Sequence, residues 1–429
     1  MIFGIFAAQA EFEGDLIRER TMAGANSSSR KTRSVWPQSA MANRAFAGID
    51  FYLGLTRPCP PLLTNWVLPI LGMNPRIDAM PSLQESFPDA TPKVREACCF
   101  YDEHYSSIGQ WLLEPGKKIV LRSSQAGTCR FCGLSEPKVK FRDVAHAIPE
   151  CIGNRSLTTD YECDECNALF GAGIETDFGY WSKAQRTMSG IRGKKGVPAH
   201  KGPNGRWRFE HRDGGFQVTQ DHDPIAVVNE DARQITLTLG VDTYTPIAVL
   251  KAFTKMALSL LPDEELSNFR AALAWIRNTD HQVGLVKTSA FPVLYTFVPG
   301  NNPLVNSVIL LRRRADNLPV PYVTFVLTYG NEVFQIIVPS PERDTVISAQ
   351  KLKFPHFPNP YELDRDLKPV APMRRELIDL TGRSLIKGET LRAVLRYELR
   401  TPNGEVAGHR EYSEGIAGHT PLVGDSSEG

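Results

Sequence analysis

The chain has 429 residues, of which 42% are hydrophobic and 23% charged, and its formal net charge is +1. A chain of this length can form two or three domains with a sizeable core, and its composition is that of an ordinary globular protein. A net charge this small excludes attraction of nucleic acid by the surface as a whole, so any such binding must come from a local basic patch.

The N-terminal part of the sequence gives few structural signals. Residues 1–50 are predicted to be largely disordered, because Ala23–Ser34 is small, polar and basic without apolar periodicity. The sequence does not predict the fold of residues 51–126. The N-terminus lacks the positive leading region of a secretory signal, and the apolar stretch Pro61–Met73 is too short to span a bilayer. We therefore expect a cytoplasmic protein without membrane contact.

Four of the eight cysteines form two Cys-x-x-Cys pairs, Cys129/Cys132 and Cys163/Cys166, separated by thirty residues. Two such pairs are typical of a metal site, because both turns can direct their sulfurs at one ion. Four thiolates complete a tetrahedral zinc site with no open position, so the sequence predicts one structural Zn²⁺. The alternatives are chance pairs that bind nothing and a redox-active pair, but a thioredoxin-like motif needs only one pair.

The segment between the pairs carries the stretch AHAIPECIGN at residues 145–154, which contains a single histidine, His146. Lys138–Val144 are predicted to form a strand that leads into His146, and Asn154 lies in a loop. Asn167 follows the second pair directly and precedes ALFGAGIETDF, which is predicted to be helical. The predicted order is a Cys-x-x-Cys turn (a zinc knuckle), a strand, the histidine, a loop, the second knuckle and a helix.

This order resembles the HNH nucleases, in which a β-hairpin and a helix surround one divalent metal (the ββα-metal fold). AHAIPECIGN followed by YECDECN is similar to a bacterial subgroup that includes stand-alone HNH proteins and nuclease modules of cyclic-oligonucleotide-activated antiphage effectors. The resemblance covers about Thr128–Pro198, roughly 70 of the 429 residues. It implies an HNH module at residues 127–201 that cleaves double-stranded DNA in the bacterial cytoplasm, in defence against phage or foreign DNA.

The resemblance also implies roles for individual residues. His146 would be the general base, since an imidazole with a pKa near 6.5 accepts a proton at neutral pH. Asn167 would help to hold one catalytic Mg²⁺ or Mn²⁺, and Asn154 would orient the loop and the imidazole. The commonest HNH motif has a metal-binding Asp directly before the base, where this chain has Ala145. Three carboxylates are candidates to replace it, and their spacing does not decide among them: Asp143, Glu150 and Glu175.

A basic stretch follows the predicted helix, and no Asp or Glu occurs from Phe178 through Trp207. Because this stretch adjoins the expected phosphodiester site, it is predicted to contact DNA phosphates without reading base sequence. The residues expected to do so are Lys183, Arg186, Arg192, Lys194 and Lys195.

Each candidate also has a purely structural interpretation. His146 could be a structural histidine beside a zinc knuckle, Asn154 a turn residue, and Asn167 the N-cap of the helix after it. Two other functions also fit the residues. One is a zinc-braced nucleic-acid-binding module that has lost catalysis, for which Ala145 is the main support. The other is an HNH-type nuclease that acts on RNA.

Residues 202–364 are predicted to form a larger α+β domain of mixed strands and two helices, which makes the fold class α+β. The domain is expected to bind a small-molecule or protein regulator or to select the target. Its apolar helix, Ile247–Leu261, is either a core helix or the seam of a homodimer. Residues 365–429 are predicted to be an extension with a frayed end. The predicted helices are Pro246–Leu261, which follows Thr245 as a Thr-Pro helix start, and Asp263–Asn278. The predicted strands are Arg206–Phe209, Phe216–Thr219, Gln234–Leu239, Val293–Val298, Val305–Leu311, Tyr322–Thr328 and Glu332–Val338. The last two strands flank Tyr329-Gly330-Asn331, which predicts a hairpin.

Overall fold

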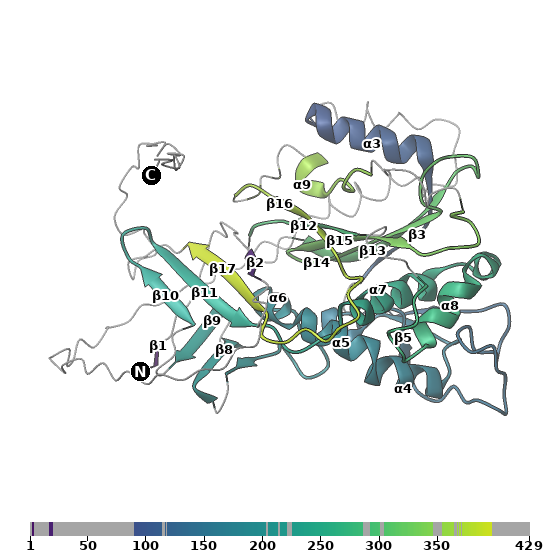
Figure 1. The fold of residues 1–429 in the computed structure, drawn as a ribbon, viewed down its shortest axis with the longest axis horizontal. Coiled ribbons are helices and arrows are strands. Elements are labelled where there is room, and N and C mark those ends of the chain that lie inside the picture. Colours follow the sequence, from purple (N-terminus) through teal and green to yellow (C-terminus); the bar gives the residue numbers. More distant parts are fainter. Residues whose placement is uncertain are drawn as a thin grey trace, which may run out of the picture.

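The computed structural model describes residues 2–3, 17–19, 90–113, 116, 118–202, 205–212, 215–220, 225–285, 292–300, 304–345, 354–363, 367, 369 and 371–396. The expectation of disorder in residues 1–50 lies outside this part of the chain, apart from the short strands β1 (Ile2–Phe3) and β2 (Ile17–Glu19). The predicted frayed end also lies outside it. The described residues form helices and several sheets, which confirms the α+β class (Figure 1).

The largest sheet has six antiparallel strands in the order β16-β12-β15-β14-β13-β3. All four strands predicted in this region are confirmed, and β14 and β15 form the predicted hairpin, in which Tyr329 pairs with Glu332. Gly330 in the turn has φ +59, which only a glycine adopts without strain. The strand bounds are β3 Tyr105–Leu112, β12 Val293–Phe297, β13 Leu304–Arg313, β14 Val323–Gly330, β15 Glu332–Val338 and β16 Arg374–Ile378.

This sheet takes its strands from three of the sequence ranges distinguished above. Its edge strand β3 belongs to the range 51–126, and the opposite edge strand β16 belongs to the range 365–429. The remaining strands lie within residues 202–364. One sheet therefore joins the uncertain N-terminal range, the predicted second domain and the C-terminal extension.

Helices cover both faces of the six-stranded sheet. The helices α3 (Pro92–His104) and α9 (Pro360–Leu363) lie on one face, and α7 (Pro246–Leu260) lies on the other (Figure 1). Alternate residues of a strand therefore enter different cores: Val326 packs with Tyr101 and Tyr105, whereas Phe325 joins the core that contains α7. Every residue of β15 is buried for this reason, although the strand contains Glu332 and Gln335.

The predicted helix Pro246–Leu261 is confirmed as α7, which begins with Pro246 at its first position. The predicted helix Asp263–Asn278 is only partly correct: residues 263–269 form the 3-10 helix η4, and α8 covers Arg270–Arg277. At this junction Ala271 N–H donates to the side chain of Glu342 and Asn268 C=O accepts from Ser340. Both backbone groups therefore bond side chains at the point where a continuous α-helix would need them for its own hydrogen bonds.

Two four-stranded sheets lie beside this core, in the orders β1-β9-β8-β7 and β10-β11-β17-β2. They contain the three short strands predicted near residues 206, 216 and 234. The strand bounds are β7 His200–Lys201, β8 Trp207–Arg212, β9 Gly215–Gln220, β10 Ala226–Asn229, β11 Gln234–Gly240 and β17 Thr390–Arg396.

The cysteine-bearing segment forms a three-stranded sheet followed by short helices. The sheet order is β4-β6-β5, in which β6 pairs parallel with β4 and antiparallel with β5. The bounds are β4 Ile119–Leu121, β5 Ala145–His146, η2 Glu150–Ile152, β6 Leu157–Thr159, α4 Asp164–Ala172, α5 Ile174–Trp181 and α6 Lys183–Met188.

The predicted strand at Lys138–Val144 is wrong, because only Ala145 and His146 are extended and paired. The side chain of Asp164 explains the difference. Its Oδ1 accepts from the backbone N–H of Arg142 at 2.8 Å and of Asp143 at 3.0 Å. These amides are bonded to one carboxylate at the start of α4 instead of to a neighbouring strand.

Every residue of α7 is buried within this single chain. The helix packs against α5 of the cysteine-bearing segment, with Phe253 against Phe178 and Trp181. This burial agrees with the interpretation of the helix as a core helix. None of the helices in the described ranges has the length and apolarity needed to span a membrane.

Candidate metal centre and the His146 site

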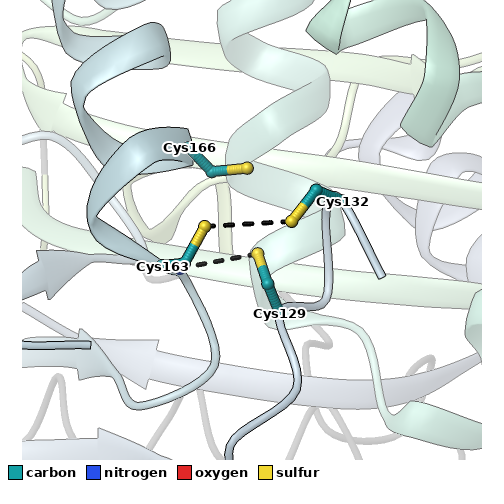
Figure 2. A group of neighbouring side chains, drawn as sticks. All are labelled: Cys129, Cys132, Cys163 and Cys166. Carbon is teal, nitrogen blue, oxygen red and sulfur yellow. Dashed lines mark hydrogen bonds between the residues drawn. The ribbon is translucent and has the colours of Figure 1, made fainter. Parts of the chain in front are cut away.

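The four predicted zinc ligands converge on one point. The sulfurs of Cys129, Cys132, Cys163 and Cys166 all lie within 4.8 Å of one another (Figure 2). The sulfurs of Cys132 and Cys163 are 3.8 Å apart. Four Zn–S bonds of about 2.3 Å in a tetrahedron place the sulfurs about 3.8 Å apart, so the group has the size of a zinc site. The four cysteines can hold a metal ion such as zinc.

Local backbone structure forms each half of this centre. In the first pair, Gly133 adopts φ +71 and its N–H donates to Cys129 C=O at 2.8 Å, which closes a tight turn. In the second pair, Cys163 is the N-cap residue of α4 and Cys166 lies in its first turn. A helix N-terminus favours negative charge, so this position suits thiolate ligands. A hydrogen bond with Cys166 lowers the pKa of the Cys129 thiol.

His146 lies on β5, opposite Thr158 of β6. Its side chain is half-buried, whereas the neighbouring Ala145 is completely buried. Burial lowers the pKa of His146; nearby Lys255 and Lys194 also lower it, and Glu150 and Glu175 oppose the shift. The imidazole is therefore neutral at pH 7 and able to accept a proton.

A buried lysine of α7 contacts the back of this strand. Lys255 Nζ lies 3.1 Å from His146 C=O, 3.1 Å from Glu162 Oε2 and 3.0 Å from Glu175 Oε1. The Lys255 and Glu162 side chains are 1% and 0% exposed, whereas that of Glu175 is 20% exposed. His146 C=O accepts a hydrogen bond from this ammonium, and the two carboxylates form ion pairs with it.

Asn154 is fully buried and uses both ends of its amide within its own loop. The NH₂ group donates to Ile148 C=O at 2.7 Å and Leu157 C=O at 2.9 Å. The side-chain oxygen accepts from Ser156 N–H at 3.1 Å and Leu157 N–H at 2.9 Å. Asn154 thus fixes the connection between β5 and β6 and has no oxygen directed to solvent.

Asn167 is the fourth residue of α4, and its N–H donates to Cys163 C=O at 2.9 Å. The alternative of Asn167 as the helix N-cap is therefore wrong, because Cys163 holds that position. The Asn167 side chain is half-buried.

The three carboxylate candidates occupy different positions. Asp143 is exposed in the loop before β5, Glu150 is half-buried in η2, and Glu175 on α5 is paired with Lys255. Across the described ranges, the four cysteines are the only group of three or more His, Cys, Asp and Glu residues close enough to hold an ion. His146, Glu150 and Glu175 are electrostatic neighbours but do not form a compact ligand set.

The five predicted phosphate contacts separate into two sets. Arg186 is buried and donates to Ser182 Oγ, Cys151 C=O and Gly179 C=O, so the structure does not support its role as a phosphate contact. Lys183 is paired with Asp242 at 2.8 Å. The exposed residues are Arg192, Lys194 and Lys195, in a turn closed by two backbone hydrogen bonds between Gly193 and Gly196.

Sequence reasoning missed two cationic residues that join the two halves of the chain. Arg130, inside the first cysteine pair, donates to the carbonyl groups of Leu258, Ser259 and Leu261 at the end of α7. Lys255 joins the middle of α7 to β5 and α5. A signal for the latter is present in the sequence, because Lys251 and Lys255 are the only charged residues of a 15-residue apolar helix. Charges in such a helix need buried partners.

No protein-family model matches the sequence, and neither a curated protein nor a solved structure is significantly similar to the chain. A function can therefore be argued only from the sequence pattern and the geometry described above.

Proposed function

We propose that the chain is a metal-dependent endonuclease of the HNH type that hydrolyses double-stranded DNA. The observation that carries the proposal is the order of elements around the cysteines: the antiparallel pair β5 and β6 is followed directly by α4, with the half-buried His146 on β5. A hairpin followed by a helix is the arrangement that the HNH resemblance implies. Zinc is the ion proposed for the four cysteines, where it would act structurally.

In this proposal His146 accepts a proton from the water that attacks the phosphodiester. Its lowered pKa supports the role, because a base must be unprotonated at the pH at which it works. Asn154 holds the β5–β6 connection, and the hydrogen bond from Lys255 to His146 C=O holds the strand itself. The exposed Arg192, Lys194 and Lys195 would contact the DNA backbone.

A bound Mg²⁺ or Mn²⁺ would stabilise charge on the phosphate and on the leaving oxygen. Asn167 together with Glu150 or Glu175 offers the oxygen ligands that such ions prefer. These residues fit the ion only in part, because no compact set of acidic ligands exists beside His146 in the described ranges. We therefore derive no step of the reaction through the ion.

A plasmid assay tests the proposal. Purified protein is incubated with supercoiled DNA and Mg²⁺ or Mn²⁺, in parallel with His146→Ala and with His104→Ala as the matched control. His104 is also half-buried, but it lies at the end of α3 on the other face of the large sheet. We expect nicked and linear products with the wild type and the control, and none with His146→Ala at unchanged zinc content. A structured RNA substrate in the same assay decides between DNA and RNA.

A second candidate function is a zinc-braced nucleic-acid-binding module without catalysis. It is favoured by Ala145 at the position where HNH nucleases usually have a metal-binding Asp, and by the pairing of Glu175 with Lys255. DNA binding without nicking, equal in the wild type and His146→Ala, would establish this function in place of the first. We further propose a defence role in the bacterial cytoplasm. Phage plating on cells that express either the wild type or His146→Ala tests this role, and we expect fewer plaques only with the wild type.

A further inference from the structure

A buried cation on α7 holds the strand that carries His146 from outside the cysteine-bearing segment. Lys255 lies in the middle of α7, more than a hundred residues after His146 in the sequence. Its ammonium bonds the backbone of β5 and the side chain of Glu175 on α5. Its third partner is Glu162, directly before the second cysteine pair. One group therefore joins the three elements that surround the candidate site.

Burial makes the loss of any of these contacts costly. The Lys255 side chain is 1% exposed, so water cannot replace a lost partner. An unpaired buried charge costs several kcal/mol, and the group therefore keeps all its partners or the region rearranges. The positions of β5 and α5 are thereby linked to the position of α7.

A second buried lysine on α7 has different partners, so contact with the His146 strand is particular to Lys255. Lys251 lies one turn before Lys255 and is equally buried. Its ammonium donates to Asn278 C=O at 2.6 Å and lies 3.2 Å from His281 Nδ1, so its partners follow α8. Lys251 thus stabilises α7 against α8, whereas Lys255 connects α7 to the His146 strand.

We propose that Lys255 is a positioning residue for the hydrolytic site: carried by α7, its ammonium holds the His146 backbone and Glu175 in their working positions. The inference rests on the proposed endonuclease function. It also assigns a physical role to the second half of the chain, because any ligand or partner that displaces α7 also displaces the His146 strand.

The test compares two lysine variants of the full-length protein. Lys255→Met is combined with Glu162→Gln, so that no carboxylate is left fully buried without its cation. Lys251→Met is the matched control. For the double variant we expect kcat for plasmid cleavage to fall about 100-fold while KM changes little, because the base is misplaced but the DNA-binding surface is intact. The control should retain the wild-type kcat. Zinc content and a cooperative unfolding transition show that each variant is folded.

The outcomes separate this inference from the proposed function. If the wild type cleaves DNA and the folded double variant retains kcat within about threefold, Lys255 is not a positioning residue, although the endonuclease function stands. If the wild type cleaves neither DNA nor RNA, the endonuclease function fails, and amide hydrogen exchange of residues 145–147 tests the link directly. Faster exchange in the double variant than in Lys251→Met supports the link, and equal exchange overturns it. Lys255→Gln replaces the double variant if the latter does not fold.

Discussion

The guanidinium of Arg130 donates to Asp263 Oδ1 at 2.7 Å, which joins the first cysteine pair to the residue where η4 begins. The same guanidinium bonds three carbonyl groups at the end of α7 and lies 3.7 Å from the centre of the Tyr161 ring. These carbonyl groups have no partner within the helix, so Arg130 completes its C-terminus. The four-cysteine cluster is therefore part of the core of the chain and not an appended module.

We predict that Arg130→Met lowers the free energy of unfolding by about 3 kcal/mol, because it removes the donor of the Leu258 and Leu261 carbonyl groups and the cation paired with Asp263. Urea denaturation measures the loss. Arg142→Met is the control, since Arg142 pairs with Asp164 but its side chain is 75% exposed. It should cost less than about 1 kcal/mol. Equal losses in the two variants would refute the role of Arg130 at the end of α7.

Substitution of any one of Cys129, Cys132, Cys163 and Cys166 by Ser is expected to abolish tight zinc binding, because three thiolates and a hydroxyl do not complete the site. Metal analysis of the purified protein should give one zinc per chain for the wild type. Cys151→Ser, which alters a cysteine between the two pairs, should retain it. Removal of zinc by a chelator should destabilise the segment between the pairs, since the bound ion would fix both of its ends. A full complement of zinc in the Cys163→Ser variant would contradict the assignment.

Asn154 and Asn167 should respond differently to substitution by Ala. Asn154→Ala removes four hydrogen bonds from a fully buried loop and should lower the free energy of unfolding by about 2 kcal/mol. Asn167→Ala alters a half-buried helix residue and should affect stability little, but it should raise the Mg²⁺ concentration needed for cleavage. Denaturation curves and a Mg²⁺ titration of plasmid nicking check the two expectations. An unchanged Mg²⁺ requirement in Asn167→Ala would exclude it as a ligand.

His200 should make the stability of the protein depend on pH. Burial, the first cause, and nearby Lys183 lower the pKa of His200 from 6.5 to about 4. The unfolded chain therefore binds a proton below pH 6.5, whereas the folded protein does so only near pH 4. This contribution to stability is complete above pH 6.5 and is lost as the pH falls towards 4.

Between pH 7 and pH 5 the loss due to His200 should be about 2 kcal/mol. Urea denaturation at the two pH values measures it, and the difference should shrink in His200→Phe, which cannot be protonated. An equal pH effect in the wild type and the variant would show that other groups cause it.

The sequence predicted local features well where a short pattern determines the structure. The spacing of the cysteines predicted the convergence of Cys129, Cys132, Cys163 and Cys166, because each pair forms its own turn. Apolar periodicity and a Thr-Pro start predicted α7, and alternation with a glycine turn predicted the hairpin of β14 and β15. Prediction failed at Lys138–Val144, where apolar and charged residues alternate but the amides are bonded to Asp164.

The sequence by itself therefore determined the two cysteine turns, the main helix and four strands of the large sheet, since these depend on residues close together in the chain. Only the tertiary structure decided which residues hold the pieces together. Arg130 and Lys255 interact with partners more than a hundred residues away, and β3 and β16 enter one sheet from opposite ends of the chain. Such contacts depend on how the elements pack, and no local pattern of residues specifies them.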